Sequence, residues 1–469
     1  MRPEPMRRPA LLFLFLAAAA QSAASFAQAA DASPKVPATF PDASPKAPKV
    51  PATFHDPAPP PMAGRYLGPA SCAQDACHGA TRPRKAFDVL QNEYYTWLNR
   101  DRHAKAYEVL YDARSAAIAR NLALARSAAE APRCLGCHVL SPPAAEQAGP
   151  IETTDGVSCE ACHGPASGWR GGHTAEGWSH EQSVAAGMLD LRDPGVRSAV
   201  CLSCHLGDGD REVDHDLLAA GHPPLRFELD NYSQAMPAHW RAMPAEGVRL
   251  WAVGQAAAFR DSARELARRA REGPWPDFSW LSCDACHHSL ADERYRQGLA
   301  TVFRARPGLP PWSPARWLVL RVLVARYAPE EVAPLDAAVA RLARDVSRLS
   351  TAPVEVSATA EAIATRMGGV AERLERVRWT PAEARRVLLD VTAARDSLAA
   401  ADLDSAAQAV QAVYTLTSYL LAERPGLLGG DLVDDVSELA REVQGRGEVD
   451  QLDRDRFRRA LARVEDGVR

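Results

Sequence analysis

The ten cysteines are the residues of this chain best suited to chemistry, and they form five pairs that are each followed directly by a histidine. Four pairs have the spacing Cys-x-x-Cys-His, and the first has two further residues between its cysteines. The cysteines are Cys72 and Cys77, Cys134 and Cys137, Cys159 and Cys162, Cys201 and Cys204, and Cys283 and Cys286. The histidines that follow them are His78, His138, His163, His205 and His287. The regular spacing is the attachment signature of c-type haem.

This spacing suits haem because two thiols add across the two vinyl groups of one porphyrin. The histidine after the second thiol is carried under the ring, where it ligates the iron on the proximal side. Structural zinc and disulfides are the alternatives, since zinc sites also pair Cys-x-x-Cys motifs and an exported chain could oxidise its thiols. Neither requires a histidine at the next position five times. We therefore predict five haem c groups, with the least regular attachment at Cys72 and Cys77.

Five irons also call for distal ligands, and six more histidines are the candidates. They are His103, His173, His222, His215, His239 and His288. His222 lies between glycine and proline on a constrained turn, so we favour it over His215 and then His239. His288 follows His287 directly, and because adjacent side chains diverge it could ligate only a neighbouring iron.

A helix predicted over residues 85–119, interrupted near Arg100, would position the first of these histidines. His103, Tyr107 and Tyr111 are spaced at i, i+4 and i+8, which places a histidine and two aromatic rings on one helix face. Such a face suits a histidine aimed at a porphyrin. The rest of the haem region is expected to be rich in loops, because stacked haems would replace much of its side-chain core.

Composition changes divide the chain into four predicted parts. They are a signal peptide at 1–29, a proline-rich disordered linker at 30–62, a pentahaem cytochrome c domain at 63–298 and a haem-free helical bundle at 299–469. The signal has a basic start, an apolar core and a small-x-small cleavage site that ends at Ala29. Bacteria attach haem outside the cytoplasm, so we predict an exported, periplasmic protein with no transmembrane span after signal cleavage.

The last 170 or so residues contain neither cysteine nor histidine, and their apolar positions recur at helical spacing. Thr380 and Glu383 form a capping box with proline between them, which predicts a helix start. Further apolar faces run over 382–399 and 403–422. The predicted fold class is therefore mainly α with extensive loops, in which a multihaem cytochrome c domain is followed by an all-α bundle.

The motifs together resemble the cytochrome c-554 (c-554/c-prime) family over about residues 66–206. The resemblance rests on Cys134-Leu-Gly-Cys-His138, on residues 156–165 and 169–173, and on Trp97 upstream of His103. Members of that family are periplasmic tetrahaem electron carriers that serve hydroxylamine oxidoreductase in nitrifiers. The resemblance implies that His103 and His173 are distal ligands to neighbouring haems, and that one iron can lack a strong sixth ligand.

The chain departs from that family in three respects. Its first motif has four residues between the cysteines, a fifth motif begins at Cys283, and a long haem-free tail follows. These departures leave the family's particular partner unassigned for this chain.

Electron transfer is the function that these features favour. The expected protein is a periplasmic pentahaem c-type cytochrome that transfers electrons between redox partners through stacked, largely bis-His haems. The alternative is a multihaem oxidoreductase that acts on a small nitrogen or sulfur compound at one open-site haem, and a structural protein that uses the haems as core is a third reading. A net charge of −4 argues against nucleic acid as a partner. The C-terminal helices could serve partner docking or homo-oligomer formation, or could form a lid over the haems.

Overall fold

The structure is a computed structural model that describes residues 64–84, 89–209, 211–237, 239–240, 244–283, 286–287, 309–423, 431–443 and 452–469. The predicted signal peptide, the predicted linker and His288 lie outside these residues. Within them, the chain is mainly α-helical with long loops, as the sequence predicts, and the extended backbone pairs only in isolated bridges such as Tyr66 with Gln147. No helix in this described part combines the length and the apolar character that crossing a membrane requires.

The motif-bearing region is built from short helices joined by loops and 3₁₀ turns. Its helices are α2 (Glu93–Arg100), α3 (Ala113–Asn121), α4 (Pro132–His138), α5 (Cys159–His163), α6 (His180–Ala185), α7 (Pro194–His205), α8 (His215–Ala219) and α9 (Leu229–Ala235). Three of the motifs form the last turns of α4, α5 and α7, so each proximal histidine ends a helix. A helical turn holds the two thiols and the imidazole on one side of the backbone.

The helix predicted over 85–119 is wrong in part. The chain leaves α2 at Asp101, whose backbone is extended, and continues through two 3₁₀ turns, η3 (His103–Lys105) and η4 (Glu108–Tyr111), before α3. Asp112 is also extended, and its side chain accepts the backbone N–H of Ser115 to cap α3. Aspartate side chains compete with the helix for backbone hydrogen bonds, which explains both interruptions. Tyr107 and Tyr111 do meet, with their hydroxyl oxygens 2.9 Å apart.

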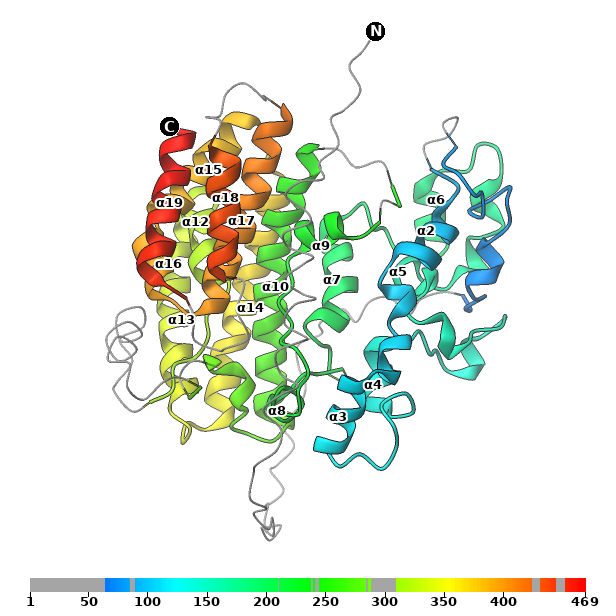
Figure 1. Ribbon diagram of the computed structural model, residues 1–469, viewed down its shortest axis with the longest axis horizontal. Helices are drawn as coiled ribbons and strands as arrows, with labels where there is room; N and C mark the ends of the chain where they lie inside the picture. The colour runs from blue at the N-terminus through cyan, green and yellow to red at the C-terminus, as the bar shows by residue number, and fades with distance from the viewer. Residues whose placement is uncertain are drawn as a thin grey trace.

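The C-terminal bundle packs long helices around one hydrophobic core. Its helices are α10 (Pro244–Glu272), α12 (Trp317–Tyr327), α13 (Val332–Ser347), α14 (Pro353–Glu375), α15 (Pro381–Ala393), α16 (Arg395–Ala400), α17 (Leu403–Glu423), α18 (Leu432–Val443) and α19 (Arg454–Val468). Thr380 accepts the backbone N–H of Glu383 at the start of α15, as the capping box predicts. Figure 1 shows the bundle beside the motif-bearing region, with α7 and α9 next to α10.

Helix α10 belongs to both regions. One side buries Trp251 and Leu266 in the bundle core, while Leu250 and Ala258 pack with Phe227 in a second cluster against α7 and α9. It lies within the range 63–298 that the sequence predicts for the cytochrome domain. The motif-bearing region is therefore built directly onto the bundle through one shared helix.

Candidate haem-binding site

A cavity of about 3770 Å³ lies between the motif-bearing region and the bundle. Pockets for a single small ligand measure about 300–1,000 Å³, so this cavity has room for several large groups. It is lined by residues of four motifs: Cys137, His138, Cys162, Cys201, Cys204, His205, Cys283, Cys286 and His287. Three of the predicted distal ligands, His103, His215 and His222, line it too, and Asp402 and Tyr414 of the bundle complete the wall.

Two pairs of imidazole rings face each other at a separation that fits a metal ion between them. The ring centres of His78 and His173 are 6.3 Å apart and their planes differ by 3°. Those of His103 and His205 are 6.2 Å apart and perpendicular, at 90°. Two imidazoles bound through Nε2 to opposite sides of one metal, with bonds of about 2 Å, would have ring centres about 6 Å apart. Each pair joins a motif histidine with a predicted distal ligand.

Two further predicted distal ligands lie near motif histidines. Burial lowers the pKa of His163 to about 4, and the positive charge of His239 lowers it further. Burial also lowers the pKa of His222, and His138 adds to that effect. A low pKa keeps an imidazole neutral, which is the form that binds metal.

Six of these histidines use the same ring nitrogen, Nδ1, for a hydrogen bond within the protein. In each, Nδ1 lies within 2.9 Å of an oxygen, which orients the ring and leaves Nε2 for a metal. The partners are Glu93 for His78, Asp101 for His103, and the backbone carbonyl oxygens of Ala106, Arg170, Pro223 and Pro237 for His138, His173, His222 and His239. His180, which no ligand prediction includes, instead engages its Nε2 with Asp190 at 2.8 Å.

The first motif shares one backbone hydrogen bond with a regular motif despite its extra residues. The His78 N–H donates to the Cys72 carbonyl oxygen at 3.3 Å, as the His287 N–H donates to Cys283 in the fifth motif at 2.9 Å. The extra residues form a turn in which the N–H groups of Cys77 and Gly79 donate to the Gln74 carbonyl oxygen. A Cβ on Gly79 would lie 1.8 Å from the Ala73 carbonyl oxygen, so the turn requires glycine there.

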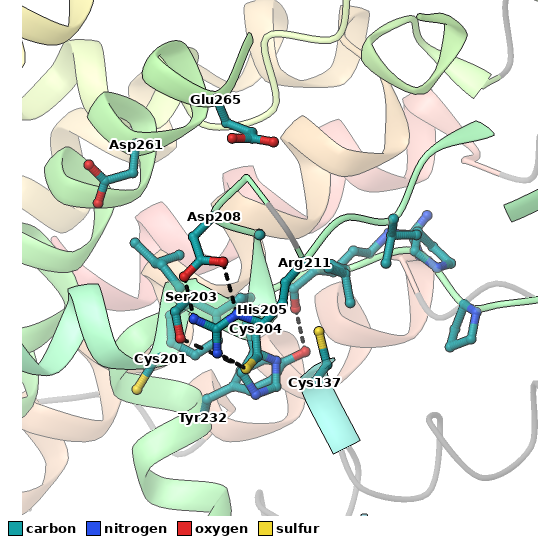
Figure 2. A pocket seen from close by; sticks show the side chains of 18 of the residues that line it. Cys137, Cys201, Ser203, Cys204, His205, Asp208, Arg211, Tyr232, Asp261 and Glu265 are labelled. Carbon is teal, nitrogen blue, oxygen red and sulfur yellow. Dashed lines mark hydrogen bonds and ion pairs between the residues drawn. The ribbon is translucent and has the colours of Figure 1, made fainter. Parts of the chain in front are cut away.

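Thiols of different motifs contact each other. A hydrogen bond with Cys159 lowers the pKa of the Cys72 thiol to about 6, and one with Cys137 does the same for Cys204. Arg211 adds to the second effect, because its guanidinium donates to the Cys204 sulfur at 3.6 Å. Figure 2 shows Arg211 between Asp208 and Cys204, with Cys137 close by. The first motif thus meets the third, and the second meets the fourth.

The residue before the fifth motif is hydrogen-bonded to the bundle. Ser282, directly before Cys283, donates to the buried carboxylate of Asp402 at 3.0 Å, and Ser313 donates to the same oxygen at 2.6 Å. His215 and His287 both line the cavity beside this motif, and the ring of His215 is in edge contact with Phe278 at 5.8 Å. Both cysteines of this motif are exposed.

Sequence reasoning missed the carboxylates that orient two of the histidines. Glu93 is 15 residues from His78, and no sequence spacing marks such a contact. Asp101 lies two residues before His103. An aspartate side chain often accepts the backbone N–H of the residue two positions later, so the sequence could have indicated this contact.

The residues fit haem, since the motif thiols, paired imidazoles and a large shared cavity occur together. Comparison with known proteins agrees, because residues 71–164 match the family model of cytochrome c554 and c-prime. No curated protein and no solved structure matches the chain. The matched segment holds the first three motifs and ends sooner than the resemblance predicted from the sequence. The likeness to cytochrome c554 and c-prime is therefore confined to residues 71–164, the segment that carries the first three Cys-His motifs.

Proposed function

We propose that this chain is a periplasmic pentahaem c-type cytochrome that transfers electrons between redox partners through bis-His haems. The observation that carries the proposal is the pair of facing imidazole couples, His78 with His173 and His103 with His205. In both, the ring separation is the one that a hexacoordinate iron needs. An iron with two strong ligands exchanges electrons and does not bind substrate, which favours a carrier.

The remaining ligand pairs follow from proximity. His138 influences the pKa of His222, and His239 influences that of His163 more than His78 does, so we pair His138 with His222 and His163 with His239. His287 is left with His215, which lines the same cavity. Each pair draws its two histidines from separate elements of the chain, so ligation and folding depend on each other.

The proposed number of five haems depends on whether the first motif binds one. The backbone hydrogen bond from His78 to Cys72 is one that the regular fifth motif also has, and it supports attachment of a haem at Cys72 and Cys77. Bound haem supplies an iron that cycles between the ferric and ferrous states. The inter-motif thiol contacts support close approach of the haem edges, first motif to third and second to fourth, which electron transfer between them requires.

The alternative function, a multihaem oxidoreductase for a small nitrogen or sulfur compound, is favoured by one observation at the fifth motif. Cys283 and Cys286 are exposed, and His215 contacts Phe278 there. An open iron in this chain would be the one held by His287. Periplasmic redox proteins are the partners that either function needs, and the C-terminal helices offer a surface for docking or self-association.

The test combines intact mass with electron paramagnetic resonance of the oxidised protein from the periplasmic fraction. We expect cleavage after Ala29, five covalent haems, and only low-spin ferric signals. Cys72→Ala should lower the mass by more than the substitution itself when the first haem is lost. Four haems in the wild-type protein would overturn the count, and a high-spin signal that responds to nitrite or hydroxylamine would put the oxidoreductase ahead.

A further inference from the structure

The Nδ1 partners of the paired histidines differ in charge. His138, His173, His222 and His239 donate to neutral carbonyl oxygens. His78 and His103 instead donate to the carboxylates of Glu93 and Asp101, both at 2.9 Å. Each of the two facing imidazole pairs therefore contains one histidine with an anionic partner.

Glu93 is held rigidly at the start of α2. Its side chain is 15% exposed, and Oε2 accepts from His78 while Oε1 accepts the backbone N–H groups of Leu90 and Gln91 at 2.8 and 3.0 Å. It is the first residue of the helix, where the helix dipole favours a negative charge. The carboxylate therefore stays ionised and fixed beside His78.

Asp101 is held even more firmly at the other end of α2. Its side chain is 3% exposed, and its Oδ1 accepts both the backbone N–H and the Nδ1–H of His103, each at 2.9 Å. It is the residue that ends the helix. A charge this deeply buried is screened little by solvent.

A carboxylate on Nδ1–H makes the imidazole a more basic ligand, and this stabilises ferric over ferrous iron. Resting on the proposed function, we propose that Glu93 and Asp101 are positioning residues that lower the reduction potentials of the haems held by His78/His173 and His103/His205. The haem held by His138 and His222, whose partners are both carbonyl oxygens, keeps a higher potential. One helix of eight residues, about 12 Å long, thus sets the potentials of two haems.

The experiment is a potentiometric titration of the holoprotein followed by electron paramagnetic resonance. The two haems can be told apart because coplanar and perpendicular imidazoles give low-spin ferric signals of different anisotropy, and the two pairs differ at 3° and 90°. Glu93→Gln should raise the potential of the coplanar haem and leave that of the perpendicular haem, and Asp101→Asn should do the reverse. A tenfold change in the ratio of ferric to ferrous affinity corresponds to about 59 mV for a one-electron couple, and we expect shifts of about this size.

Two further variants serve as controls. Asp101→Glu keeps a carboxylate, so the haem held by His103 and His205 should retain a low potential. This variant distinguishes an effect of the lost charge from an effect of the changed side-chain shape. Glu108→Gln removes an exposed carboxylate that pairs with Lys105 at 3.4 Å, and should move neither haem.

The outcomes separate this inference from the proposed function. If both signals are present but the potentials do not move, or both move equally in either variant, Glu93 and Asp101 do not tune individual haems and only this inference falls. If the wild-type protein lacks the two signals, the ligand pairs themselves are wrong, and the inference falls with them.

Discussion

At the scale of single residues, the ring nitrogen that is hydrogen-bonded separates the predicted ligand His173 from His180, which is not a predicted ligand. His173 has its Nδ1 held by the Arg170 carbonyl oxygen, which leaves its Nε2 for a metal, and its ring centre is 6.3 Å from that of His78. His180 is seven residues away and also partly buried, yet its Nε2 is engaged with Asp190. Exposure and residue type do not distinguish these two histidines, whereas the orientation of the ring does.

Replacing each of them by alanine tests this distinction. His173→Ala should remove one strong ligand, so that one haem per chain changes from low-spin to high-spin in the electron paramagnetic resonance spectrum. His180→Ala should leave the spectrum and the haem count unchanged. A high-spin signal of equal size in both variants would show that ring orientation does not identify the ligands.

At the scale of elements, short loops adapt the chain to its unusual first motif. The turn after Cys72 absorbs the extra residues, and it closes only because Gly79 has no side chain to meet the Ala73 carbonyl oxygen. The geometry of the first motif therefore depends on Gly79, a residue that has no side chain with which to contact a haem.

Gly79→Ala is expected to open this turn and displace Cys72 from His78. We predict loss or incomplete attachment of one haem, read from the intact mass of the holoprotein. Gly368→Ala is the matched control, since its added Cβ would meet nothing within 4 Å in the middle of α14, and it should keep all haems and gain about 0.5–1 kcal/mol of stability. Full haem content in Gly79→Ala would contradict the role given to the turn.

At the scale of the whole molecule, a group of buried polar side chains, which we call the polar seam, joins the motif-bearing region to the bundle. It includes Glu228, Asp230, Arg316 and Thr415. Glu228 is 1% exposed and accepts the backbone N–H groups of Asp230 and Asn231 at the start of α9. Thr415 of α17 donates to Asp230 at 2.7 Å, and the buried Arg316 donates to the Phe227 carbonyl oxygen. Charged groups therefore lie where the two regions meet.

This seam makes stability depend on pH. Burial raises the pKa of Glu228 to about 7 from its ordinary value of 4.5, and the Asp230 charge adds to the shift. The folded protein thus holds a proton that the unfolded chain has lost, so the free energy of unfolding should fall as pH rises from 4.5 to about 7, by about 3 kcal/mol. Denaturant unfolding at several pH values measures this fall.

Glu228→Gln should flatten that dependence, because the amide keeps the shape of the side chain and cannot ionise. Glu272→Gln, at a position that is 60% exposed on α10, should keep the wild-type slope. Equal slopes in all three proteins would assign the pH dependence to other groups.

Local patterns made some of this structure predictable. Cysteine spacing fixes the motif turns, and the N-cap at Thr380 fixes the start of α15, because both depend on neighbours in the chain. The long helix predicted through His103 fails since Asp101 and Asp112 redirect the backbone. Glu93 reaches His78 only through tertiary packing, so no pattern within the sequence could have shown it.

The thiol contacts between motifs constrain the order in which the protein can be made. Cys72 meets Cys159, and Cys137 meets Cys204, in the folded chain. Had the chain folded in an oxidising compartment with these thiols free, each contact could close as a disulfide and deprive two motifs of a sulfur. Four of the five Cys-His motifs would then each lose a thiol to these two bonds. If the proposed function holds, we therefore expect haem to be attached to an open chain before these thiols come together.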